Sequence, residues 1–89
     1  MKAVITVVGI DKVGIIAAVS GVLADTGVNI LDISQTILQD YFTMMMLVDL
    51  SEMEPSLEEL KDRLQSTGKK HGVSIRIQHE DVFRTMHRI

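Results

Sequence analysis

Segments 29–38 and 73–78 of the chain alternate apolar and polar residues, segments 3–8 and 41–50 are rich in β-branched and other apolar residues, and three further segments repeat apolar residues every three or four positions. Alternation among β-branched residues is typical of strands, whereas the three-to-four spacing is typical of helices with one apolar side. We therefore expect strands at 3–8, 29–38, 41–50 and 73–78. Helices are expected at 15–26, 57–71 and 80–89, with fraying of the second helix from Gly68.

The order of these segments predicts an α+β fold. Strand, helix, strand, strand, helix, strand normally gives the ferredoxin-like βαββαβ arrangement, a four-stranded antiparallel sheet with two helices on one face, here followed by a short C-terminal helix. The first strand has β-branched residues on both faces and is expected inside the sheet. Gln39 and Asp40 predict a tight hairpin turn. No linker or repeat divides the sequence, so we expect one domain over residues 1–89.

The first helix has two different sides. Its large apolar residues form a stripe that should face the sheet, consisting of Ile15, Ile16, Val19, Val22 and Leu23. The other side carries Ala17, Ser20, Gly21 and Ala24, small residues that permit close approach of a second helix but are also simply tolerated in helices. Gly27 is expected to end this helix, and Pro55 is expected in the first turn of the second one.

Composition narrows the classes of function. Hydrophobic residues make up 46% of the 89 residues and the net charge is −3, which favours self-association and argues against a nucleic-acid-binding surface. The absence of cysteine excludes disulfides, thiolate zinc sites and a cysteine nucleophile. Met1 and Lys2 lead directly into a strand, and no apolar run approaches membrane-spanning length. We therefore expect a cytoplasmic protein with no nucleic-acid or membrane partner.

No pattern in the sequence points to catalysis or to a metal site. The predicted topology brings no nucleophile, histidine and acid together, so we expect no catalytic residues, no enzyme activity and no cofactor. The three methionines at 44–46 should alternate across a strand, which favours core or interface packing over copper binding. His71, His79 and His87 lie at element ends without a paired carboxylate and are interpreted as surface residues rather than metal ligands.

The loop between the first strand and the first helix is the strongest candidate for a binding site. Gly9 and Gly14 bracket it, which leaves backbone N–H groups of the first helical turn open to an anion. Asp11 would meet an ammonium group, and Asn29, at the start of the second strand, is expected near Gly14 with both donor and acceptor groups. These groups together suit a zwitterion. A turn glycine and a turn-tolerant asparagine would explain the same residues without a ligand.

Two longer stretches carry a resemblance to a known family. Asp11-Lys12-Val13-Gly14-Ile15-Ile16 and Thr26-Gly27-Val28-Asn29-Ile30, on a βαββαβ chain, resemble the ACT domain, a small-molecule-sensing module of amino-acid metabolism. The segments 32–36, 41–45 and 82–86 are most similar to stand-alone bacterial and archaeal members with a single such domain. The chain also resembles the N-terminal ACT unit of proteins that regulate glycine cleavage.

The resemblance implies a homodimer, or a higher oligomer, with an amino acid or related small metabolite bound between the first loop of one subunit and the second strand of its neighbour. The ligand-binding residues that it implies by position are Asp11, Lys12, Val13, Gly14, Ile15, Asn29 and Ile30. Gly14 would offer a backbone N–H contact, Asn29 would bind the α-amino and carboxyl groups, and Ile30 would line the interface. Gly9 stands where serine-binding members have histidine, and Asp11 where they have asparagine, so this ligand can differ from serine.

This interpretation predicts a regulatory protein that signals to a partner protein through its dimer interface. A ligand-free dimeric interaction module of the same fold is the main alternative, and an unrecognised enzyme with its site in the same cleft is a third. Asp32, Ser34 and Thr36 form a polar row along the second strand. This row is either a ligand or subunit contact or a solvated sheet face.

Overall fold

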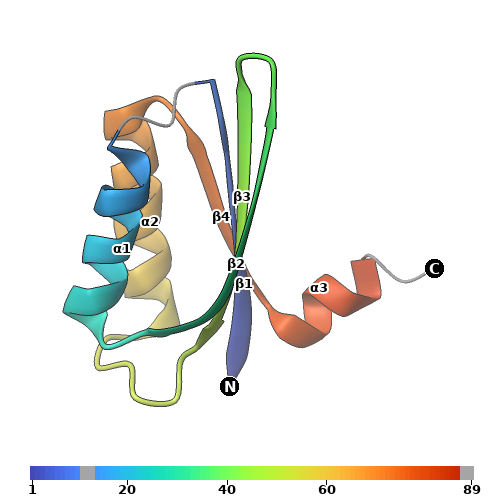
Figure 1. Ribbon diagram of the computed structural model, residues 1–89. Helices are drawn as coiled ribbons and strands as arrows, with labels where there is room; N and C mark the ends of the chain where they lie inside the picture. The colour runs from blue at the N-terminus through green and yellow to red at the C-terminus, as the bar shows by residue number, and fades with distance from the viewer. Residues whose placement is uncertain (11–13, 87–89) are drawn as a thin grey trace.

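The computed structural model describes residues 1–10 and 14–86 of the chain. Its elements, in chain order, are β1 (Lys2–Gly9), α1 (Ile15–Thr26), β2 (Asn29–Leu38), β3 (Tyr41–Asp49), α2 (Leu57–His71), β4 (Ser74–His79) and α3 (Glu80–Met86) (Figure 1). The predicted βαββαβ order with a terminal helix is confirmed. None of the helices in the described ranges is long and apolar enough to span a membrane.

The four strands form one antiparallel sheet in the order β2-β3-β1-β4. The predicted inner position of β1 is therefore confirmed, and β2 and β4 are the two edges. The pairing of β1 with β3 runs from Lys2 opposite Asp49 to Gly9 opposite Phe42. Gln39 and Asp40 form the predicted tight turn between β2 and β3, and Gln39 has a left-handed backbone with φ of 54°.

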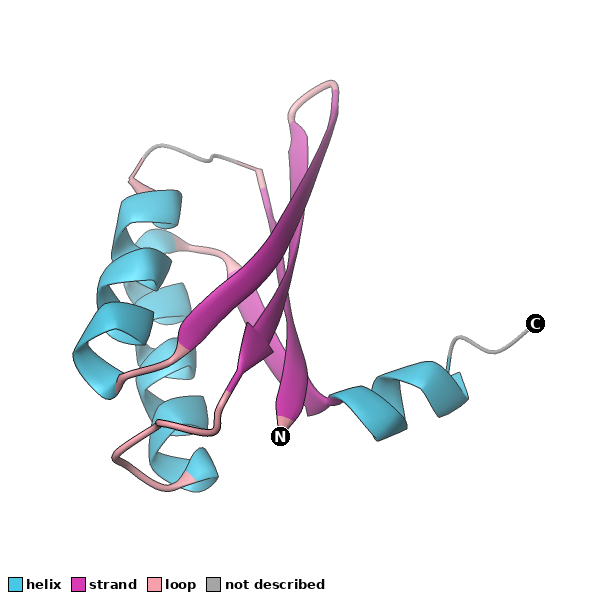
Figure 2. Ribbon diagram, turned by 60° about the horizontal axis from the view of Figure 1, so that its bottom comes forward, coloured by secondary structure: helices cyan, strands magenta, loops and turns pink. Residues whose placement is uncertain are grey.

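Helices α1 and α2 cover one face of the sheet, and α3 lies on the other side. Figure 1 shows the sheet nearly edge-on between them, and Figure 2 shows α3 leaving the end of β4 and projecting away from the strands. The hydrophobic core fills the space between the sheet and the two covering helices. Its members are Ala3, Ile5, Val7, Ile15, Val19, Leu23, Val28, Phe42, Met44, Met46, Val48, Leu50, Leu60, Leu64 and Ile75.

Strand alternation decides which side chains face α1 and α2. Met44 and Met46 are fully buried on the helix side, whereas Met45 between them is half-buried on the opposite side. The expected alternation of the three methionines is therefore confirmed. We call this opposite side the open face. By the pairing register, the middle of this face is formed by Val4, Thr6, Val8, Asp32, Ser34, Thr36, Thr43, Met45, Leu47, Ser74, Arg76 and Gln78.

Helix α1 has the two sides that its sequence predicts. Ile15, Val19 and Leu23 are fully buried, and Ile16 and Val22 pack at the margin of the core. On the other side Ala17, Gly21 and Ala24 are exposed. Gly27 ends the helix as predicted, with φ of 76° and its N–H donating to the carbonyl of Ala24 at 3.3 Å. The small-residue side therefore faces outward in a single subunit.

Two details of α2 correct the prediction. Pro55 is not in the first turn, because the Ser56 side chain caps the helix by accepting from the Glu59 N–H at 3.1 Å, which makes Leu57 the first helical residue. Gly68 does not start a frayed end. It is buried, and its carbonyl accepts from the Val73 N–H at 2.9 Å, so the helix continues to His71.

Strand β2 departs from the expected alternation at one residue. The pairing with β3 shifts between Ile30 and Asp32, which leaves Leu31 as a β-bulge. Ile30 and Ile33 consequently both pair with buried β3 residues of the helix side, Val48 and Met46. Leu31 therefore lies outside the alternation of Ile33 and Ile37 with the polar row of Asp32, Ser34 and Thr36.

Candidate functional site

Gly14 adopts the conformation that its place before a helix demands. Its φ is 76°, a left-handed backbone that favours glycine, and its carbonyl accepts from the Ala18 N–H at 3.0 Å at the start of α1. The next residue, Ile15, has its side chain fully buried in the core. Only the backbone of Ile15 is therefore available to a ligand. Asp11, Lys12 and Val13 lie outside the described residues.

Asn29 lies at the other end of α1 from Gly14. The helix has 12 residues, which corresponds to about 18 Å at a rise of roughly 1.5 Å per residue. The sheet register agrees, since Asn29 pairs with Asp49 while Gly9, at the end of β1 that leads to the loop, pairs with Phe42. The expectation that Asn29 approaches Gly14 within one chain is therefore wrong, because the helix between them carries the chain along the whole sheet.

The surroundings of Asn29 are polar and acidic. It is exposed at the start of β2 and lines a small cavity of about 120 Å³ together with Asp49, Ser51 and Glu52. Its neighbour Ile30 is half-buried and packs against the core. A carboxylate and an amide at one small cavity are suited to bind an ammonium group.

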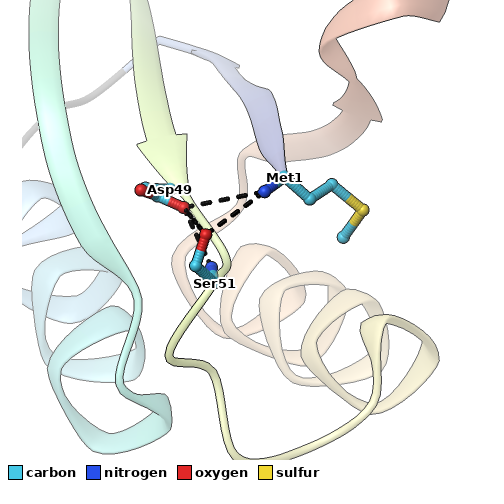
Figure 3. Close-up of polar contacts among 3 residues, drawn as sticks. All are labelled: Met1, Asp49 and Ser51. Atoms are coloured by element: carbon cyan, nitrogen blue, oxygen red, sulfur yellow. Dashed lines mark hydrogen bonds and ion pairs between the residues drawn. The ribbon is translucent and has the colours of Figure 1, made fainter.

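Asp49 is held in place by a short polar network (Figure 3). Its Oδ1 accepts from the Ser51 hydroxyl at 2.6 Å and from the Ser51 N–H at 2.9 Å. The Met1 amine lies 3.9 Å from the same Oδ1 and donates to the Ser51 Oγ at 3.2 Å. The hydrogen bond from the Ser51 side chain, followed by that from its backbone, lowers the pKa of Asp49 below its usual value of 3.8. Asp49 therefore carries its negative charge at neutral pH.

Sequence reasoning did not select Asp49 or Ser51. Their place beside Asn29 depends on the bulge at Leu31, because the register set by Leu38 opposite Tyr41 would otherwise pair Asn29 with Leu50. The available signal was Asp49 followed by Ser51 at the end of the third strand, a spacing at which an aspartate accepts from the backbone two residues on.

The outer edge of β2 is apolar and exposed. Leu31 is 44% exposed, Ile33 42%, Ile37 54% and Leu38 70%. In the described part of the chain β2 pairs only with β3, so its outer N–H and C=O groups line the same edge. A long edge strand with apolar side chains is a surface that proteins normally cover.

The histidines and acids give no metal site among residues 1–10 and 14–86. His71 is exposed at the end of α2. His79 has a carboxylate nearby, since its Nδ1 lies 3.6 Å from Asp81 Oδ2, but that nitrogen accepts from the Asp81 N–H at 3.1 Å and so makes no hydrogen bond to the carboxylate. This contact belongs to the junction of β4 and α3, because Asp81 is in the first turn of α3. His87 lies outside the described residues.

Comparison with known proteins gives the family. A family model described as ACT domain matches residues 2–78. A UPF0237 protein of Clostridium acetobutylicum is 60% identical over 89 residues, which cover all of both chains. The structure of an ACT domain protein from Streptococcus pneumoniae has a TM-score of 0.81 and 48% identity over 93% of each chain.

A further solved structure bears on the second resemblance. A candidate glycine cleavage system transcriptional repressor is 28% identical with a TM-score of 0.70, over 86% of this chain and 44% of that one. The resemblances to single-domain members and to glycine cleavage regulators are both confirmed. The chain belongs to the ACT domain family.

Proposed function

We propose that this chain is a regulatory module that forms a homodimer through its β2 edges, binds an amino acid or related small metabolite at that interface, and signals to a partner protein. The observation that carries the proposal is the exposed apolar edge of β2. Asn29 lies at the start of this strand, and Gly9, which begins the loop to Gly14, lies level with its hairpin end. The module has no enzyme activity of its own in this proposal.

The sheet geometry supports a site that is shared between two subunits. If two β2 strands pair antiparallel about a two-fold axis, one subunit is inverted relative to the other. The start of β2 in one subunit then lies beside the hairpin end of its neighbour. Because Gly9 pairs with Phe42, next to that hairpin, the loop before α1 is at the hairpin end. Asn29 and the Gly14 of the partner subunit would thus come together across the interface.

The chemistry of the two ends supports an amino acid as the ligand. At one end Asn29 and the ionised Asp49 offer an amide and a carboxylate, which suit an α-ammonium group. At the other end Gly14, with its left-handed backbone, precedes α1. The first N–H groups of this helix would bind an anion such as the α-carboxylate. In this proposal Asp11, Lys12 and Val13 complete the loop side, the backbone of Ile15 adds an N–H, and Ile30 lines the interface.

Thermal melting against the twenty amino acids tests the proposal. A ligand at about 100-fold above its Kd should stabilise the folded protein by about 2.7 kcal/mol, which raises the melting midpoint by several degrees. The rise should occur for one amino acid or a few related ones and should be lost in Asn29→Ala. Ser66→Ala, an exposed position on α2, is the matched control that should keep the shift.

Other outcomes separate the alternatives. A dimer that no amino acid stabilises would favour a ligand-free interaction module of the same fold. Disappearance of the added amino acid during incubation, followed by chromatography, would favour an enzyme. An equal shift in wild type and in Asn29→Ala would place the ligand elsewhere.

A further inference from the structure

A cavity on the open face is separate from the site at the β2 edge. Its volume is about 400 Å³, within the usual range for small-molecule pockets. Four elements line it, β1, β3, β4 and α3, through Thr6, Val8, Met45, Ser74, Arg76, Gln78 and Phe83. Because β4 is the edge opposite β2, the cavity lies toward the far side of the sheet from the β2 edge.

The floor of the cavity is apolar although it is open. Val8 is 44% exposed on an inner strand, and Met45 beside it is half-buried. Phe83, half-buried on α3, forms a third apolar contact where α3 leaves the sheet. A methionine and an aromatic ring provide an adaptable apolar surface for a small hydrophobic group.

In the part of the chain that the structure describes, Arg76 is the one charged side chain that lines this cavity. In the sheet register Arg76 pairs with Thr6, and Thr6 pairs with Met45 on its other side. The three residues form one row across the open face, so Arg76 starts from the same row as Met45 of the apolar floor. Among the described residues no carboxylate forms an ion pair with Arg76, and Glu80, at the start of α3, pairs with Arg84 at 3.6 Å. The hydroxyls of Thr6 and Ser74 provide further donors at the wall.

We propose that this cavity binds a small apolar carboxylate that lacks an ammonium group. The unpaired guanidinium and two hydroxyls would hold the carboxylate, and Val8, Met45 and Phe83 would pack against the apolar body. In residues 1–10 and 14–86 no acidic side chain lines the cavity, so an ammonium group bound there would lose water without gaining a charged partner. The preference is therefore opposite to that of the acidic cavity at Asn29, which suits an ammonium group.

Titration with three matched probes tests the inference. 3-Phenylpropanoate, phenylalanine and 2-phenylethylamine share one apolar body and differ in carboxylate and ammonium groups. Amide chemical shifts of the labelled protein should move with 3-phenylpropanoate, and the moving residues should lie on β1, β4 and the start of α3. Phenylalanine should bind there at least about tenfold more weakly, and 2-phenylethylamine should leave these amides unchanged.

Substitutions separate this cavity from its neighbour. Arg76 also lines a groove of about 380 Å³ between α2 and β4, to which Lys61 contributes a second cation. Arg76→Gln should weaken 3-phenylpropanoate about tenfold or more, Arg76→Lys should restore part of the affinity, and Lys61→Gln should have no effect. Val8→Asp should abolish binding of 3-phenylpropanoate, because two carboxylates would repel each other. Val8→Asn, whose side chain has the shape of aspartate without its charge, should weaken binding less.

Several results would overturn the proposal. Equal binding of phenylalanine at these amides would remove the selection against an ammonium group. Loss of affinity in Lys61→Gln would move the site to the α2 groove. A changed sedimentation coefficient for Arg76→Gln, with unchanged probe affinity, would show that a second copy of the chain covers the open face. None of these results depends on Asn29, so they can be distinguished from failure of the amino-acid site.

Discussion

Gly21 in α1 and Gly68 in α2 are both inside helices, yet their surroundings differ. A Cβ at Gly21 would meet no described atom within 4 Å, whereas a Cβ at Gly68 would lie 2.7 Å from the Val73 carbonyl oxygen and 3.3 Å from Ile75 Cγ1. Gly21→Ala should therefore raise the free energy of unfolding by about 0.5 to 1 kcal/mol, because alanine restricts the unfolded chain. Gly68→Ala should lower it by about 1 to 3 kcal/mol through overpacking against backbone.

Denaturant titration of the two variants checks this contrast. The same substitution in the same secondary structure should give opposite signs, which a difference in helix propensity alone does not produce. A gain in stability for Gly68→Ala would contradict the close packing of α2 against the chain that leads into β4.

For single residues, the sequence predicts the backbone conformation better than it predicts which other residues lie close in space. Gly14 and Gly27 were predicted at the two ends of α1, and both have φ of 76°, because few other residues fit that backbone at a helix end. The approach of Asn29 to Gly14 was not predictable in the same way. It depends on the length and direction of the helix between them, and Asp49 reaches Asn29 only through the bulge at Leu31.

The edge strand β2 is the element on which the proposed assembly rests. Ile33 lies near its middle, so a two-fold axis between paired β2 strands would bring the two copies of this residue close together. Ile33→Lys should then place two like charges at the interface and dissociate the dimer, since lysine on an edge opposes pairing. Val82→Lys, at a comparably exposed apolar position on α3, is the control.

Analytical ultracentrifugation distinguishes these variants. The sedimentation coefficient should fall to that of a monomer for Ile33→Lys and should stay unchanged for Val82→Lys. The reverse result would move the subunit interface to the side of the sheet that carries α3.

The order of elements followed from the sequence because strand and helix periods differ clearly along this chain. The β-type residues at 41–49 predicted β3 and the alternation of its three methionines, and the structure shows that Met44 and Met46 are the buried ones. The bulge in β2 is not identified in the same way, because Ile30 and Leu31 are adjacent apolar residues but so are Ile37 and Leu38, where the pairing is regular. Sheet pairing with β3 creates the bulge, and single-strand patterns do not contain that information.

The whole molecule has one packed layer between sheet and helices and leaves two further surfaces uncovered, the β2 edge and the open face. A chain of 89 residues buries a limited core, so subunit contacts contribute a large share of stability. For a dimer that unfolds to separate chains, a tenfold increase in protein concentration should raise the melting midpoint by about 4 °C. Calorimetry over a range of concentrations measures this dependence, and a midpoint independent of concentration would contradict a dimer held together in the folded state.

The alternation of the three methionines in β3 has a consequence for oxidation. A peroxide in solution reaches Met45, which is half-buried on the open face, before Met44 and Met46, which are buried beneath the helices. Sulfoxide formation at Met45 adds a polar oxygen to the floor of the open-face cavity, whereas the same reaction at Met44 or Met46 requires the core to open. The rates of oxidation of these three consecutive residues thus report on two different events. The rate at Met45 depends on whether the open face is covered, and the rates at Met44 and Met46 depend on unfolding of the domain.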